Sequence, residues 1–265
     1  MDIKVLFEKE NEKPLDIIKD DGGFCSIFRT IGCIGDSLSS GEFESTDGKG
    51  NKGYHDFFEY SWGQYIARMT GSKVYNFSRG GMTAEEYCNS FAEKNGFWDK
   101  DKACRAYIIA LGVNDLYGRN MEIGSLADIC DYDPRKNKPT FAGYYAQIVS
   151  RMKDIEPDAK FFFMTMPRED KNEYQTSQGD AHAELLYELA NYFNNAYVID
   201  LRKYGPVYDG YFKNKFYLGG HMNACGYVLT AKMVASYIDY IVRHNMDDFR
   251  QIGFVGTPFR NQGEI

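Results

Sequence analysis

The sequence predicts an α/β protein built on a doubly wound parallel sheet. Short apolar runs alternate along the chain with longer segments in which apolar residues recur at helical spacing, and this alternation occurs five times. Polar turns that contain glycine follow several of the runs directly. Strands separated by helices pair in parallel and are covered by helices on both faces, so the pattern predicts one sheet within a single domain, residues 1–265.

The five apolar runs are the predicted strands of this sheet. They cover residues 31–34, 73–77, 106–111, 161–166 and 196–200. Polar turns that include Ser37, Gly81 and Asn114 follow the first three of them. Because ligands of open α/β sheets bind beyond the carboxyl ends of the strands, we expect these three turns to converge on one edge.

The segments between the strands predict the helices. Two further segments are rich in glycine and polar residues, and we expect residues 41–53 to form a flexible loop and residues 117–139 a long irregular one. Apolar residues recur at helical spacing over 57–69, 141–155, 181–193 and 227–242, and Thr83-Ala84-Glu85-Glu86 has the outline of a capping box that opens another helix.

The two ends of the chain lie outside this alternation. Residues 1–27 are expected to be an N-terminal extension that adds a strand or hairpin to the sheet, because they carry apolar patches at Val5-Leu6-Phe7 and near Phe24. Residues 245–265 are expected to be a polar C-terminal tail with one apolar patch, residues 252–255.

The composition indicates an ordinary globular protein. Of the 265 residues, 43% are hydrophobic and 26% are charged, and the formal net charge is -7. A negative chain without a basic run is not expected to bind nucleic acid or an anionic membrane. The first residues show no basic stretch before an apolar core, and no run reaches the roughly 18 apolar residues that span a bilayer, so the expected location is the cytoplasm. The sequence leaves the oligomeric state open.

The six cysteines are expected to be reduced thiols. They form no Cys-x-x-Cys pair and show none of the Cys/His spacings of a zinc site. The sequence therefore predicts neither a structural metal nor a disulfide framework.

Ser37 is the candidate nucleophile. It follows the first strand directly, behind a glycine that gives the backbone room to turn. Acyl transfer through serine also needs a base, and the sequence has four histidines, at positions 55, 182, 221 and 244. His221 lies in a glycine-flanked loop immediately before the last predicted helix. The other three are expected at the rim of the site, at a helix start and at a helix end, respectively.

Four short blocks carry a resemblance to a known family. The blocks are Gly35-Asp36-Ser37-Leu38, the turn 76–83, Gly112-Val113-Asn114-Asp115, and His221-Met222-Asn223. Their order, and the positions of the first three at predicted strand ends, resemble the SGNH or GDSL hydrolases, a family of GDSL-like esterases, lipases and acylhydrolases. The resemblance implies a three-layer, flavodoxin-like fold, a serine hydrolase that acts on esters, and no metal or other cofactor.

The resemblance also implies roles for individual residues. Ser37 would be the nucleophile and His221 the general base. The backbone N–H groups of Ser37 and Gly81 and the side-chain amide of Asn114 would form an oxyanion hole with three donors. Asp36 is expected to hold the turn by side-chain hydrogen bonds.

The chain departs from the family at one position. The family usually has an aspartate three residues before the histidine, where this chain has Leu218. Such an acid fixes the imidazole tautomer and stabilises the imidazolium. Two groups remain as alternatives for the third member, the backbone carbonyl of Leu218 and the carboxylate of Asp209.

Substrate signals are weaker than the catalytic ones. Tyr217 lies in the aromatic loop before His221, and Tyr117 follows the Asn114 turn, so both are candidates to contact substrate. No long apolar lid is visible, which favours short acyl esters of acetyl type, on a small molecule or on carbohydrate. The alternatives are an acyl thioesterase and, in another class, a catalytically weak glycan-binding module on the same fold.

Overall fold

A computed structural model of the chain describes residues 3, 7 and 9–263. Its centre is a sheet of five parallel strands in the order β4-β1-β5-β6-β7. This sheet and its strand order confirm the predicted doubly wound, flavodoxin-like architecture. The strands are β1 (Thr30–Gly35), β4 (Lys73–Asn76), β5 (Ala106–Ala110), β6 (Lys160–Met164) and β7 (Ala196–Ile199).

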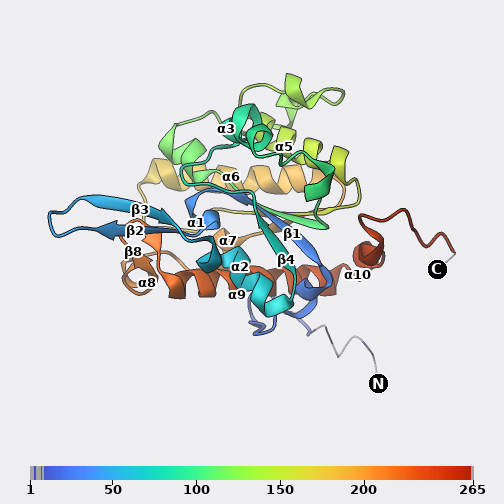
Figure 1. The fold of residues 1–265 in the computed structure, drawn as a ribbon, viewed down its shortest axis with the longest axis horizontal. Helices are drawn as coiled ribbons and strands as arrows, with labels where there is room; N and C mark the ends of the chain where they lie inside the picture. Colours follow the sequence, from blue (N-terminus) through green and yellow to red (C-terminus); the bar gives the residue numbers. More distant parts are fainter. Residues whose placement is uncertain (1–2, 4–6, 8, 264–265) are drawn as a thin grey trace.

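Helices cover both faces of the sheet (Figure 1). One face packs on α2 (Trp62–Thr70) and α9 (Ala224–His244), and the other on α3 (Ala84–Glu86), α5 (Phe141–Ile155) and α6 (Glu173–Tyr192). The remaining helices have seven residues or fewer: α1 (Ser37–Ser40), α4 (Ala92–Lys94), α7 (Leu201–Tyr204), α8 (Gly210–Phe216) and α10 (Met246–Phe249). Within the described part of the chain, none of the helices combines the length and the apolar character needed to cross a bilayer.

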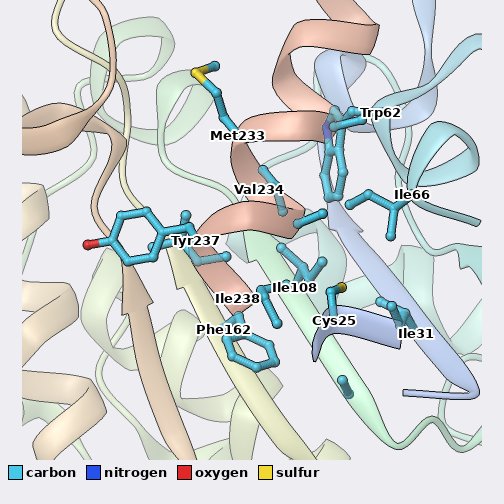
Figure 2. Close-up of a cluster of buried hydrophobic side chains, with 14 of the residues drawn as sticks. Cys25, Ile31, Trp62, Ile66, Ile108, Phe162, Met233, Val234, Tyr237 and Ile238 are labelled. Carbon is cyan, nitrogen blue, oxygen red and sulfur yellow. The ribbon is translucent and has the colours of Figure 1, made fainter. Parts of the chain in front are cut away.

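Alternating strand residues feed two separate hydrophobic cores. In β6, Phe162 points into the core under α2 and α9, whereas Phe161 and Phe163 belong to the core under α5 and α6. Figure 2 shows the first core, where Trp62 of α2 and Val234 of α9 meet the strands. Each such side chain contributes about 1.5–3 kcal/mol when fully buried, so the strand-end turns are mounted on a rigid support.

Two helices begin where they are predicted, α3 at Ala84 and α5 at Phe141, whereas α2 begins at Trp62 and α9 at Ala224. Thr83 accepts a hydrogen bond from the Glu86 N–H at 3.2 Å, and Thr140 caps α5 in the same way. Helix α6 is different, because it begins at Glu173 and not at the predicted residue 181. Its first turns are polar and carry no apolar stripe, and Asn172 provides the cap. His182 therefore lies inside a helix, and the prediction that it begins one was wrong.

The expected flexible loop 41–53 is instead largely a β-hairpin. Strands β2 (Glu42–Thr46) and β3 (Lys52–Asp56) pair in antiparallel fashion and extend away from the central sheet (Figure 1). The Asp47 carboxylate holds the tip by accepting from the N–H groups of Lys49 and Asn51. The sequence pattern missed these strands because most of their side chains are polar or charged.

The two chain ends also differ from expectation. Among the described residues up to 27 there is no strand, only turns and a 3-10 helix, Gly23–Ile27, and Val5 and Leu6 lie outside the described residues. This segment packs along α9, where the Phe24 N–H donates to Asp239. At the other end α10 and a 3-10 turn follow α9, and the predicted apolar patch is confirmed by the buried side chains of Ile252 and Val255.

Candidate active site

One pocket of about 340 Å³ collects most of the predicted site residues. Ser37, Asn114, His221 and Tyr217 all line it. Gly81 and Tyr117 are not among its lining residues. The pocket opens where β1 and β5 end, so the strand-end turns do converge with the loop that precedes α9.

The end of β1 fixes the position of Ser37. Asp36 caps the short helix α1, and its carboxylate accepts from the Leu38 N–H at 3.1 Å. Burial raises the pKa of Asp36 to about 6. A Cβ on Gly35 would lie 2.2 Å from the Ser39 hydroxyl, so only glycine permits the tight turn into α1. Ser37 is half-buried and is the first residue of α1, so its N–H has no partner within the helix.

Gly81 lies in the turn that follows β4. Its φ is 69°, a left-handed conformation that favours glycine, and a Cβ there would meet no atom within 4 Å. Backbone conformation and not space therefore requires glycine at this position. Among the described residues, the Gly81 N–H donates to no other main-chain group of a turn or loop.

Asn114 links the three strand-end turns. Its side-chain amide donates to the Met82 carbonyl at 3.1 Å and lies 3.4 Å from the Asp36 carboxylate. The neighbouring Asp115 is fully buried and accepts from the Ala84 N–H at 2.8 Å. Burial raises the pKa of Asp115 to about 7. These contacts hold the turns after β1, β4 and β5 in one fixed arrangement.

The other three histidines lie away from the pocket lining. His182 is buried, and its Nε2 bonds to the Leu111 carbonyl at 3.1 Å. Its ring packs against Gly112 in the turn after β5. Burial lowers the pKa of His182 to about 4. His55 pairs with Ser45 on the exposed hairpin, and His244 bonds to the Tyr240 carbonyl at the end of α9.

His221 is held by carboxylates from the hairpin. It lies on β9 (His221–Met222), which pairs with β8 (Tyr217–Leu218). Its Nε2 is 2.9 Å from Glu42 Oε1, and its Nδ1 is 3.6 Å from Glu44 Oε2. Sequence reasoning missed these two glutamates, because they lie in the segment expected to be a loop. The one signal that could have pointed to Glu44 is the pair of glycines before His221, which leaves room for a close neighbour.

Neither predicted third member reaches the imidazole. The Asp209 carboxylate caps α8 and accepts from the Phe212 N–H at 2.8 Å. Among the described groups, His221 Nδ1 has no hydrogen-bond partner, so the Leu218 carbonyl does not bond to it either. No hydrogen bond joins His221 to the Ser37 hydroxyl within the described part of the chain. In unliganded active sites such bonds are often long and tighten when substrate binds.

A small, mostly apolar cavity lies next to the turn that carries Ser37, although Ser37 itself is not in its lining. It measures about 50 Å³ and shares four lining residues with the larger pocket, Asp36, Leu38, Val113 and Pro167. Met164 and Met166, at the end of β6, complete its apolar wall. The site thus combines a large opening with a narrow apolar recess.

The outer rim of the pocket is polar. Lys213 and Lys171 flank Glu169, at 2.7 Å and 3.6 Å from its carboxylate, and Tyr217 lies among them in the lining. Tyr117 lies behind this rim, with the Lys171 ammonium 5.9 Å from its ring centroid.

Residues 33–229 match the GDSL-like lipase/acylhydrolase family. Among solved structures, the chain is similar to a family two carbohydrate esterase from Clostridium thermocellum in complex with cellohexaose, at 16% identity and TM-score 0.56, over 89% of this chain and 66% of that one. A family 2 carbohydrate esterase from Corynascus thermopiles (Myceliophthora fergusii) is similar at 16% identity and TM-score 0.56, over 81% and 66%. An acetyl xylan esterase is similar at 17% identity and TM-score 0.51, over 79% and 99%. At these identities the likeness establishes the fold, and no curated protein matches the sequence.

Proposed function

The chain belongs to the GDSL-like lipase/acylhydrolase family of carboxylic ester hydrolases, and we propose that it removes short acyl groups, of acetyl size, from carbohydrate. Ser37 is the nucleophile and His221 the general base. The observation that carries the proposal is the small apolar cavity that shares Asp36 and Leu38, the two neighbours of Ser37, with the larger pocket, within the family's fold.

The reaction proceeds through an acyl-enzyme. Ser37 Oγ attacks the ester carbonyl carbon while its proton passes to His221. The carbon–alkoxy bond then breaks, and His221 returns that proton to the departing sugar oxygen. Water attacks the acyl carbon in the second half, gives a proton to His221, and releases the acid as Ser37 regains its hydrogen.

The tetrahedral intermediates need donors for their oxyanion. The N–H of Ser37 and the N–H of Gly81 are available, as described above. The Asn114 amide would exchange its long 3.4 Å contact with Asp36 for the oxyanion, while its bond to the Met82 carbonyl keeps it in place. Because the bond to the Met82 carbonyl holds the amide, it stabilises the oxyanion with little reorganisation during the reaction.

The small cavity sets the size of the acyl group. At about 50 Å³ it accommodates an acetyl or propionyl group and not a long chain. A pocket that clashes with one extra methylene discriminates by about 10–200-fold. The polar rim of Glu169, Lys171 and Lys213 suits the hydroxyl groups of a sugar, and the similar structures named above include carbohydrate esterases.

The test is a series of p-nitrophenyl esters, run beside an acetylated xylo-oligosaccharide. We expect kcat/KM to fall by at least about tenfold from acetate to butyrate and further to octanoate. Met164→Ala, which enlarges the cavity, should shift the preference toward butyrate, and Ser37→Ala is the inactive control. A rate that is flat or rises with chain length would contradict the proposed acyl specificity.

A further inference from the structure

We propose that Glu44, on the hairpin strand β2, is the carboxylate that orients His221 and stabilises its cationic form. It would replace the acid that is absent at position 218. The inference rests on the proposed function, because His221 acts there as the base. Glu44 is a positioning residue, since it touches the base and not the reacting atoms.

Glu44 is buried and firmly held. Its side chain is 3% exposed. Lys52 Nζ lies 2.7 Å from Oε1, and the Gly220 N–H donates to Oε2 at 2.8 Å. These hydrogen bonds, from Lys52 first and Gly220 second, hold the pKa of Glu44 below its usual value. The carboxylate is thus ionised and its direction is fixed before substrate arrives.

His221 Nδ1 faces this carboxylate and no other partner. The two atoms are 3.6 Å apart, too far for a hydrogen bond, and Nδ1 is buried without a partner among the described groups. A buried ring nitrogen without a partner destabilises the fold. When Nδ1 carries a proton, a shift of less than about 1 Å gives a charge-assisted bond of about 2.8 Å.

The two glycines before His221 make room for Glu44. A Cβ on Gly219 would lie 2.4 Å from Glu44 Oε1, and one on Gly220 would lie 3.0 Å from Oε2. Gly219 also has a φ of 64°. The Gly-Gly-His sequence is therefore shaped around the Glu44 carboxylate, independently of the distance to Nδ1.

Glu42 plays a different part. Its Oε1 lies 2.9 Å from Nε2, the nitrogen opposite the one that faces Glu44. Nδ1 is buried against Glu44, so Nε2 is the nitrogen that must take the proton of Ser37. Glu42 thus occupies Nε2 in the free protein and has to release it for catalysis, whereas Glu44 can stay in place throughout.

Other titratable groups surround His221, and among the described contacts none of them hydrogen-bonds to the imidazole. Tyr54 of β3 meets the ring edge-on, with 5.6 Å between centroids. Asp56 of β3 bonds to Ser40. Asp36, Glu169, Lys171 and Lys213 line the pocket together with His221.

The test compares carboxylate-to-amide variants in the full chain with an acetyl ester. Glu44→Gln keeps an acceptor for the Gly220 N–H and nearly the same shape. We expect kcat to fall by about 10²–10⁴, with KM little changed, because a triad acid acts on the base and not on substrate binding. The acid limb of the kcat/KM profile should also move to lower pH, since the imidazolium loses its counter-charge.

Three matched variants separate this role from structural effects. Asp209→Asn makes the same chemical change at the cap of α8, Lys52→Gln removes the ion-pair partner of Glu44, and Glu42→Gln changes the other carboxylate. Each should cost less than about tenfold in kcat, because none removes the carboxylate at Nδ1. If Glu44→Gln fails to fold, Glu44→Asp is the replacement variant, because its shorter side chain keeps the charge but places the carboxylate farther from Nδ1. It should fold, and its kcat should lie between that of the parent and the value expected for Glu44→Gln.

Two results would overturn the inference. One is a folded Glu44→Gln variant that stays within threefold of the parent in kcat and pH profile. The other is a large loss of kcat in Glu42→Gln or Asp209→Asn while Glu44→Gln keeps its kcat. Failure of the proposed function would look different, because the unmodified protein would then turn over no acetyl ester. In that case the rate of phosphonylation of Ser37 serves as the readout for the same variants.

Discussion

The two walls of the pocket are built in different ways. One wall carries the proposed nucleophile: Ser37 and Asn114 line it from turns that directly follow β1 and β5, and Asn114 ties the turn after β4, which holds Gly81, to them from outside the lining. On the other, His221 sits on the two-residue strand β9 and is held by side chains of a hairpin that is remote in sequence. The nucleophile wall is therefore fixed by the backbone and the sheet, and the base wall by pairs of charged side chains.

Charge behaves differently on the two walls. Burial raises the pKa of Asp36 to about 6 and that of Asp115 to about 7 on the nucleophile wall. On the base wall, burial also raises the pKa of Glu42, whereas Lys52 and Gly220 hold the pKa of Glu44 below its usual value. Under the proposed mechanism, Glu44 on the base wall supplies the negative charge that the imidazolium needs.

The largest expected effect on kcat comes from replacing Ser37 on one wall or His221 on the other. Ser37→Ala and His221→Ala should each lower kcat by at least about 10⁴ on short p-nitrophenyl esters, and the double variant should lose little more. Both residues act on one proton transfer, so their losses do not add. Circular dichroism checks that each variant is folded. A folded Ser37→Ala variant with full activity would show that Ser37 is not the nucleophile.

The next effect belongs to the oxyanion donors of the nucleophile wall. Asn114→Ala should lower kcat by about 10²–10³ with little change in KM, because the amide acts mainly in the transition state. Steady-state kinetics on p-nitrophenyl acetate measures both constants. A rise in KM alone would mean that Asn114 binds substrate and leaves the oxyanion to the backbone.

The smallest expected effect concerns the buried carboxyl of Asp115, behind the nucleophile wall. Asp115 has a usual pKa of 3.8, raised to about 7 in the folded state, so the folded state binds more protons between about pH 4 and 7. The free energy of unfolding should therefore fall as pH rises through that window. In Asp115→Asn this fall should be reduced, so the variant gains stability relative to the parent from pH 4 to 7. Urea unfolding at several pH values measures the free energy of unfolding. Parallel plots of that free energy against pH for the two proteins would contradict the prediction.

The arrangement of the strand-end turns could be predicted from sequence because its determinants are local. Buried apolar runs mark the strands, and the polar turns that follow them must meet at one edge of a parallel sheet. The base wall could not be predicted in the same way. His221 was identified by its loop, but Glu42 and Glu44 lie on a polar hairpin without an apolar pattern, and their contact with His221 joins segments far apart in the chain.

Labelling with a short alkyl phosphonate tests most directly whether the two walls act as one site. The account predicts that the reagent forms one covalent adduct, on the peptide that contains Ser37, and that ester hydrolysis is lost as the adduct forms. His221→Ala should slow labelling by orders of magnitude, because the serine then lacks its base. An adduct on another residue, or an unlabelled Ser37 in protein whose ester hydrolysis is blocked, would contradict the account.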